Sequence, residues 1–143
     1  MKILLTGATG YIGRRLKQRL LQDENVQLRL FVRNKKKVRD PYKSQLEIVE
    51  GSTFNKESLL KALKGIDVAY YLIHSMGAKG DFKKLDRLSA ENFLNASIKA
   101  QVQRIVYLGG LGIKDTASKH LLSRIETGEI LSSKPESIQT IWF

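Results

Sequence analysis

The first fourteen residues change from the hydrophobic pattern of a buried strand to that of a helix. Residues 2–6 are mostly apolar, and a segment with glycines at positions 7, 10 and 13 follows at once. Apolar side chains then recur at helical spacing: Tyr11, Ile12, Leu16, Leu20 and Leu21. The pattern predicts a strand, a tight turn and a helix in direct succession.

The rest of the chain continues this alternation. Further strands are predicted at residues 26–32, 46–51, 68–73, 104–108 and 138–143. A second helix is predicted to begin after Thr53 or Asn55 and to end at Gly65, a third begins at Asp81, and the last spans 119–133. Strands that alternate with helices predict an α/β fold on a parallel sheet. The apolar residues predicted on the inner face of the third helix are Phe82, Leu85, Phe93, Ala96 and Ala100.

The glycine turn has the properties of an anion site. Glycine lacks a Cβ, so it reaches positive φ angles and lets a ligand touch the backbone. The helix that follows directs its free N–H groups and the positive end of its dipole toward the turn. The GxxGxxG spacing is a weak signal by itself, but its position between a strand and a helix is the context that a dinucleotide fingerprint requires. We expect a pyrophosphate here, and an ordinary strand-to-helix connection is the alternative.

Length and composition restrict the chain to few classes of protein. With 143 residues, 42% of them hydrophobic, it fits one domain over residues 1–143. No cysteine is present, which excludes disulfides, thiolate metal sites and a cysteine nucleophile. The start is too short for a signal peptide, and no apolar run is long enough to span a membrane. We therefore expect a soluble cytoplasmic protein. No metal site is expected, because the two histidines lie far apart in the sequence.

The net charge of +11 is concentrated near the glycine turn. Residues 14–43 contain eleven Lys or Arg and three Asp or Glu, a local net charge of +8. Three interpretations remain open: a site for the 2′-phosphate of NADP, a surface that binds polyanions nonspecifically, and a solvated face.

The end of the second strand favours NADP over NAD. In dinucleotide-binding folds this position meets the adenosine ribose, where a carboxylate binds the 2′-hydroxyl and an arginine accommodates a 2′-phosphate. Here Arg33 follows the strand, and no carboxylate comes before Asp40. Arg14, just past the last glycine, is a second candidate for the phosphate, although spacing alone does not separate it from Arg15.

Five segments carry a resemblance to a known family. The sequence TGATGYIG at residues 6–13 resembles the cofactor loop of the extended and atypical short-chain dehydrogenase/reductase superfamily. The segments FVRN at 31–34, YYLIHSM at 70–76, RIVYLGGLG at 104–112 and HLLSR at 120–124 are similar to its NmrA-like NAD(P)-binding branch. The resemblance implies a Rossmann-type doubly wound parallel sheet of six strands in the order 3-2-1-4-5-6, with helices on both faces. Typical members continue well beyond residue 143.

The ligand crevice of such a sheet lies outside the carboxyl ends of its strands. The segment after the fourth strand is therefore expected near the nicotinamide, and a structural hydrogen bond is the other interpretation of His74. Asn92 likewise either matches an active-site asparagine of the superfamily or is a polar residue on a helix surface. The predicted cofactor contacts are Gly7, Thr9, Gly10, Tyr11, Ile12, Gly13, Arg14, Arg33, Ser52, Ile73, His74 and Ser75.

Three positions depart from the family pattern. Members usually have an aspartate near the adenine where this chain has Ser52. Active members have a serine after the fifth strand, where this chain has Gly109 and Gly110, and a YxxxK pair on the next helix. His120 and Arg124 take the places of that tyrosine and lysine, four residues apart on a helix. They are the candidate catalytic pair, because histidine transfers protons near neutral pH and arginine binds ribose hydroxyls, and a surface pair is the alternative.

These residues support two main functions and a lesser third one. The first is an NADP(H)-binding Rossmann protein, a weak or vestigial oxidoreductase that acts on an unidentified small molecule. The second is a non-catalytic regulator that senses dinucleotide occupancy and acts through a protein partner. A nucleic-acid binder that uses residues 14–43 ranks below both, no membrane partner is expected, and a homo-oligomer is a further expectation.

The last predicted strand carries the apolar residues Ile138, Ile141, Trp142 and Phe143. Relatives place their substrate-recognition region after this strand, so one wall of the substrate pocket is expected to be missing if the protein ends at residue 143. A shortened relative and the cofactor-binding half of a longer protein are the two alternatives. We expect the strand to pair at the sheet edge with its aromatic side chains against the last helix, or to be covered by a second copy of the chain.

Overall fold

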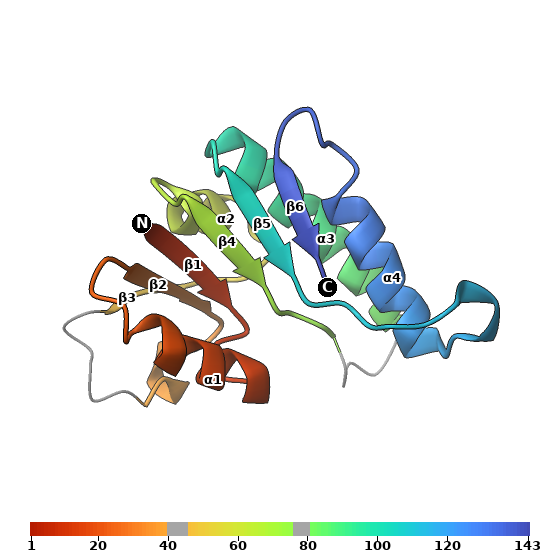
Figure 1. Ribbon diagram of the computed structural model, residues 1–143, viewed down its shortest axis with the longest axis horizontal. Helices are drawn as coiled ribbons and strands as arrows, with labels where there is room; N and C mark the ends of the chain where they lie inside the picture. The colour runs from red at the N-terminus through yellow and green to blue at the C-terminus, as the bar shows by residue number, and fades with distance from the viewer. Residues whose placement is uncertain (40–45, 76–80) are drawn as a thin grey trace.

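The structure is a computed structural model that describes residues 1–39, 46–75 and 81–143. Six parallel strands form one sheet in the order β3-β2-β1-β4-β5-β6 (Figure 1). This confirms the predicted strand order and the Rossmann-type fold. The strands are β1 (Lys2–Thr6), β2 (Gln27–Val32), β3 (Leu46–Glu50), β4 (Val68–Tyr71), β5 (Arg104–Tyr107) and β6 (Gln139–Trp142).

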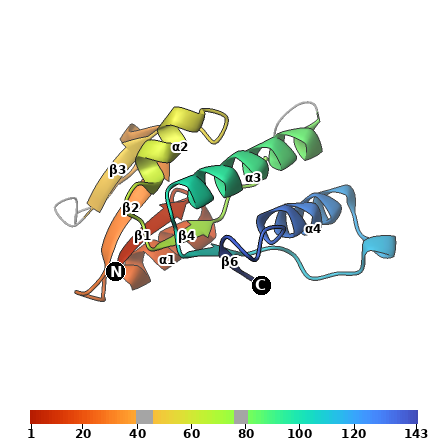
Figure 2. The ribbon, with the colours of Figure 1, turned by 90° about the horizontal axis from the view of Figure 1, so that it is seen from above.

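In the part of the chain that the structure describes, four α-helices pack on the sheet. Helix α1 packs on one face, and α2, α3 and α4 lie side by side on the other, as the view from above shows (Figure 2). Within the described residues, the short 3-10 helices η1 and η3 lie in the connections. The helix bounds are α1 (Tyr11–Leu20), η1 (Lys35–Lys37), α2 (Lys56–Leu63), α3 (Phe82–Lys99), η3 (Lys114–Thr116) and α4 (Lys119–Leu131).

The strand pleat divides the apolar residues between two cores. On β1, Ile3 and Leu5 face α1, whereas Leu4 faces the helices on the other side. All three side chains are buried, which is why the strand reads as a continuous apolar run. Because the six strands are parallel, their carboxyl ends all lie at one edge of the sheet, where the glycine turn also lies (Figure 1).

Helix boundaries follow the capping residues. The side chain of Asn55 accepts a hydrogen bond from the backbone N–H of Ser58 at 2.9 Å and so caps α2. Thr53, the alternative cap, is instead buried. Gly65 follows α2 with a φ of +72°, as predicted for a helix end. Asp81 caps α3, which confirms the predicted start of that helix.

The predicted inner face of α3 was wrong at Leu85, which is 36% exposed. The buried face instead contains Asp86, Ser89 and Phe93, at spacings of three and four residues. Two of these three residues are polar, so an apolar pattern alone selected Leu85 in place of Asp86, whereas the predicted Phe93 and Ala96 are buried as expected.

Strand β6 forms one edge of the sheet and pairs with β5, as expected. The side chain of Trp142 packs against α4: a Cβ added to Gly128 would lie 2.3 Å from the indole. Phe143 is 66% exposed. The expected packing of the aromatic side chains against the last helix is therefore confirmed for Trp142 and wrong for Phe143.

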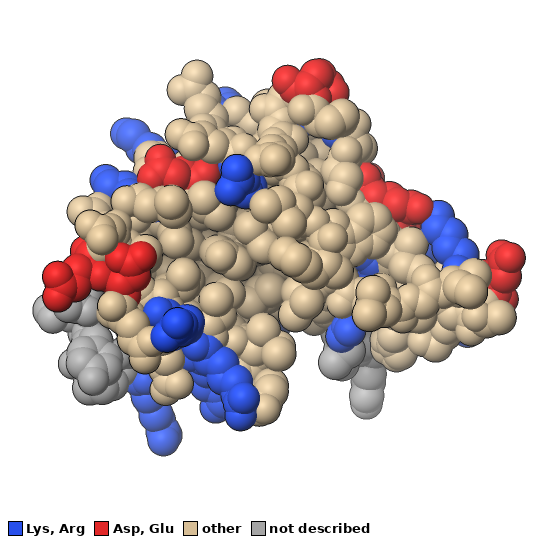
Figure 3. All heavy atoms as spheres, viewed as in Figure 1, with Lys and Arg blue, Asp and Glu red and all other residues tan. Residues whose placement is uncertain are grey.

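Over β4, β5 and β6 the molecule has only two layers, the sheet and the helices on one of its faces (Figure 2). Among the described residues no helix covers the face of these strands that Figure 1 presents. The half-buried residues Tyr70, Val106 and Ile141 lie side by side there, in register across the three strands. In Figure 3 this region carries few charged side chains, whereas Lys and Arg gather over α1.

Candidate functional site

The turn between β1 and α1 is closed so tightly that only glycine fits at two of its positions. Gly7 has a φ of +66°, and a Cβ built on it would lie 2.4 Å from the backbone oxygen of Leu72. A Cβ on Gly13 would lie 2.2 Å from the backbone oxygen of Gly7. The backbone N–H of Gly10 donates to that same Gly7 oxygen at 3.0 Å. The predicted positive φ is thus confirmed at Gly7, whereas Gly10 and Gly13 close the turn through backbone contacts.

The N-terminus of α1 has the properties of an anion site. Gly10 is its N-cap, no side chain caps it, and its first turn contains no acidic residue. The first N–H groups of a helix have no partner within the helix, and the helix dipole attracts negative charge there. Thr9, Tyr11 and Ile12 are exposed around it. Backbone donors at an accessible helix end, beside glycines that admit close approach, fit a dinucleotide pyrophosphate.

Thr6 joins the glycine turn to the end of β4. Its buried hydroxyl donates to the backbone oxygen of Tyr70 at 2.9 Å and accepts from the N–H of Leu72 at 3.0 Å. These bonds hold the segment after β4 against the turn. Sequence reasoning missed Thr6, since a threonine at the end of a buried strand gives no signal of its partners.

On the other side of the turn, Arg33 lies exposed at the end of β2. The N–H of Gly51 donates to the backbone oxygen of Val32 at 2.9 Å, so the end of β3 is beside it. Ser52 follows, and its hydroxyl accepts a local hydrogen bond from the N–H of Phe54 at 3.2 Å. Arg14 is exposed in the first turn of α1. The structure thus brings Arg33 and Ser52 to neighbouring strand ends.

A carboxylate that the sequence did not place here comes from β3. Glu50 accepts a hydrogen bond from the backbone N–H of Lys35 at 2.8 Å. No acid follows β2 directly in the sequence, and Glu50 reaches this position only because β3 pairs with β2.

Arg15 differs from Arg14 in its contact, because its guanidinium lies 4.6 Å from the centre of the Tyr11 ring.

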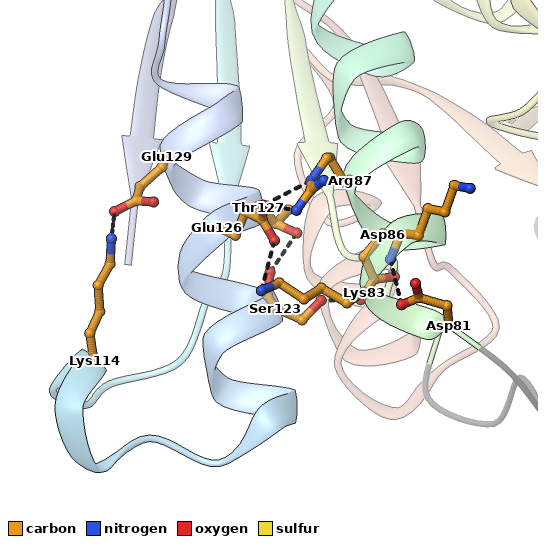
Figure 4. A network of polar contacts seen from close by, with 10 residues as sticks. Asp81, Lys83, Asp86, Arg87, Lys114, Ser123, Glu126, Thr127 and Glu129 are labelled. Carbon is orange, nitrogen blue, oxygen red and sulfur yellow. Dashed lines mark hydrogen bonds and ion pairs between the residues drawn. The ribbon is translucent and has the colours of Figure 1, made fainter.

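The segment 73–75 is fixed by a buried acid from α3. Asp86 accepts a hydrogen bond from the backbone N–H of Ser75 at 2.8 Å and another from the hydroxyl of Ser123 at 2.9 Å. Figure 4 shows Ser123 of α4 and Asp86 of α3 pointing toward each other. Arg87 and Glu126 join the same two helices nearby, at 2.7 Å. Asp86 therefore connects α3, α4 and the loop after β4.

His74 lies between α3, α4 and β5. Its ring centre is 5.9 Å from that of Tyr107, and its Nδ1 is buried without a hydrogen-bond partner among the described residues. Burial lowers the pKa of His74, and the positive charge of Arg124 lowers it further. The charge of Asp86 and the backbone oxygen of Leu108 oppose this effect. The ring is therefore neutral at pH 7.

This lowered pKa predicts a loss of stability in mildly acidic solution. Histidine in the unfolded chain has a pKa near 6.5, so above that pH the ring is neutral in both states. As the pH falls below 6.5, the unfolded chain takes up the proton first and the free energy of unfolding decreases, until the folded protein also binds the proton. Urea unfolding at pH 7.5 and 5.5 measures the decrease, which should be smaller in His74→Gln. Equal decreases in both proteins would contradict the assignment.

The structure separates the contacts of His120 and Arg124. His120 is exposed and stacks on Phe82 of α3, with ring centres 4.5 Å apart. Arg124 is half-buried and acts electrostatically on His74 and Tyr107. The backbone oxygen of Arg124 accepts a hydrogen bond from the hydroxyl of Tyr107 at 2.9 Å. Two side chains that share one helix therefore contact different groups, and Arg124 is the one beside the loop after β4.

Asn92 is buried and donates to the backbone oxygen of Thr53 at 3.0 Å. The surface interpretation of this residue was therefore wrong, because α2 and its preceding turn cover it. Asp86 was missed, although helical spacing gives a signal for it: it is four residues after Phe82 and seven before Phe93, on the buried side of α3.

Two searches of the described residues bear on other classes of function. No group of three or more His, Cys, Asp or Glu in residues 1–39, 46–75 and 81–143 is arranged to hold a metal ion. Within the same ranges, none of the helices combines the length and the apolar character needed to cross a bilayer.

Comparison with known proteins places these features in context. A family model described as NAD(P)H-binding matches residues 7–140. A farnesyl-dihydroquinoline-oxide ketoreductase of Stigmatella aurantiaca is 25% identical over 111 residues, which are 76% of this chain and 33% of the relative. The auxiliary protein GraX of Staphylococcus aureus is 26% identical over 114 residues, which are 76% of this chain and 36% of GraX.

Solved structures share the fold over nearly the whole chain. The NADPH-dependent quinone oxidoreductase QOR2 of Escherichia coli, complexed with NADPH, matches with a TM-score of 0.80 and 25% identity, covering 98% of this chain and 47% of QOR2. The triphenylmethane reductase of Citrobacter sp., complexed with NADP(H), matches with a TM-score of 0.81 and 22% identity, covering 98% of this chain and 48% of the reductase. The chain thus spans about a third of the length of these curated relatives and about half of these solved proteins.

Proposed function

We propose that this chain, which belongs to the NAD(P)H-binding family, binds NADP(H) in preference to NAD(H) and serves an oxidoreductase reaction. The observation that carries the proposal is the uncapped N-terminus of α1 behind a turn in which Gly7 and Gly13 admit no Cβ. Backbone N–H groups there supply donors to a pyrophosphate without a competing carboxylate.

Each side of the turn has a separate role. Arg33 and Arg14 would neutralise a 2′-phosphate, because both are exposed, at the end of β2 and in the first turn of α1, and arginine binds phosphate with two donors. Residues 73–75 are on the opposite side, at the end of β4, where they would border the nicotinamide. When bound, the dinucleotide supplies hydride transfer, and this chain supplies orientation and proton transfer. Ser52, just after the end of β3, would contact the adenosine.

We expect Arg33→Ala to weaken NADPH binding by about 10- to 100-fold and to leave NADH binding within about twofold. The reason is that a lost charge-assisted hydrogen bond to phosphate costs about 1.5–3 kcal/mol, whereas NADH has no 2′-phosphate. Isothermal titration calorimetry with both dinucleotides measures the difference. Lys61→Ala is the matched control, since it removes one exposed charge on α2, across the sheet.

Two results would count against this proposal. Equal affinity of the wild-type protein for NADPH and NADH would remove the NADP preference. Binding of neither dinucleotide would remove the site itself, and the glycine turn would then be an ordinary connection.

A second candidate is a regulator that senses dinucleotide occupancy and does no chemistry. It is favoured by Gly109 and Gly110 at the position of the superfamily's serine, by the exposure of His120, and by the similarity to an auxiliary protein. NADPH oxidation in the presence of aldehydes, ketones and quinones separates the two functions. Binding without turnover supports the regulator. Turnover in the wild-type protein that is lost in His120→Ala or in His74→Gln refutes it.

A further inference from the structure

A group of exposed cations on and beside α1 and η1 extends beyond the proposed dinucleotide site. With Arg14 and Arg33 assigned to the dinucleotide, six exposed cations remain in this part of the chain. They form what we call the α1–η1 surface: Arg15, Arg19, Lys35, Lys36, Lys37 and Arg39. Figure 3 shows Lys and Arg side chains gathered over this part of the molecule.

The packing of η1 brings the two groups of cations to the same side of the sheet. Val38, directly after η1, is buried in the same apolar core as Leu16 and Leu20 of α1. Arg15 and Arg19 are four residues apart on α1, a spacing that places both on one helix face. Segments before and after β2 therefore contribute to one cationic surface.

The described acids do not neutralise this surface. No ion pair between described residues involves any of its six cations. Glu50 contacts Lys35 through the backbone N–H, and Asp23 and Glu24 lie beyond the C-terminus of α1. Because a phosphate monoester carries a charge of about −1.5 to −2, a 2′-phosphate held by Arg14 and Arg33 does not account for the further cations.

The composition of the surface matches a nucleic-acid interface. None of the large hydrophobic side chains exposed in the described residues falls within positions 14–39. A helix that lies in a membrane surface inserts an apolar face, and protein–protein interfaces have a centre enriched in aromatic residues and depleted of lysine. Interfaces with nucleic acids are polar and strongly positive. The cations without apolar neighbours therefore favour a chain of phosphates.

We propose that the α1–η1 surface binds the phosphate backbone of a nucleic acid without reading its bases. Each cation that meets a phosphate releases a condensed counterion, and this release supplies the binding free energy. The inference adds a second ligand to the chain and does not depend on dinucleotide binding, since its six cations are not those assigned to the dinucleotide.

Fluorescence anisotropy of a labelled oligo(U) RNA tests the inference with the 143-residue protein in the absence of dinucleotide. We expect a Kd on the order of 10⁻⁵ M at physiological salt. If all six cations meet a phosphate, the slope of the logarithm of the binding constant against the logarithm of the salt concentration should be about −4, at about 0.7 per contact. Oligo(A) should bind within about threefold of oligo(U), because phosphate contacts carry no sequence information.

Replacing the three lysines of η1 by Gln in one variant should weaken RNA binding by about 10- to 100-fold and bring the salt slope to about −2. Arg19→Gln should reduce the magnitude of the slope by about 0.7, because α1 shares the surface. The matched control carries Lys61→Gln, Lys64→Gln and Lys99→Gln, which remove the same charge from the other face of the sheet. Its Kd should stay within about threefold of the wild-type value, because salt screens distant charges.

Four results would overturn the inference. Equal weakening in the two triple variants would mean that net charge, and not this surface, binds RNA. Binding to vesicles that contain an anionic lipid but not to RNA would assign the surface to a membrane, and binding to polyglutamate alone would assign it to an acidic protein. Unchanged anisotropy even at low salt would make the surface a solvated face.

Discussion

Gly7→Ala should destabilise the protein by roughly 2–5 kcal/mol and abolish dinucleotide binding. An alanine in the left-handed region costs about 1–2 kcal/mol, and a forced displacement of packed backbone adds about 1–3 kcal/mol. At Gly7 both terms apply, because φ is +66° and the Cβ would lie 2.4 Å from the Leu72 oxygen. The displaced turn would also misdirect the N–H groups of α1. Urea unfolding and calorimetry with NADPH measure the two effects.

Gly65→Ala is the matched control for this substitution. Gly65 has a φ of +72°, but no atom lies within 4 Å of the position of its Cβ. Its replacement should therefore cost only about 1 kcal/mol and leave binding unchanged. A similar loss of stability in both variants would show that φ alone decides, and that the contact between the turn and β4 contributes nothing.

Asp86→Ala should lower the free energy of unfolding by about 3 kcal/mol, which corresponds to a fall in Tm of roughly 10 °C. The carboxylate is buried and accepts from Ser75 and from Ser123, so its removal leaves two donors without partners. Because its charge also raises the pKa of His74, the pKa of that ring should fall further in the variant. Thermal unfolding and an NMR titration of His74 measure these two consequences.

Two control variants separate the parts of this effect. Ser123→Ala removes one donor together with its bond and should cost about 1 kcal/mol. Asp115→Ala removes an exposed carboxylate from η3 and should change stability by no more than about 0.5 kcal/mol. If Asp86→Ala unfolds like Asp115→Ala, the acid does not hold the loop after β4.

The helices and strands could be read from the sequence alone. Strand and helix differ in the period of their apolar residues, and this period is a local property that ten residues are enough to establish. The turn over residues 7–13 was equally readable, since only glycine tolerates the backbone contacts that close it. The caps at Asn55 and Asp81 depend on residues three positions away, so they too are recorded locally.

Which polar side chains meet depends on the packing of elements that are distant in the sequence. Asp86 reaches Ser75 and Ser123, which are 11 and 37 residues away in the chain, because α3 packs between the loop after β4 and helix α4. The same packing turns Arg124 toward His74, whereas His120 stacks on Phe82. A spacing of four residues places two side chains on one helix face, but the neighbouring helix determines what each of them touches. The apolar pattern also missed the polar residues on the inner face of α3, because the contacts that bury Asp86 and Ser89 are hydrogen bonds to other elements.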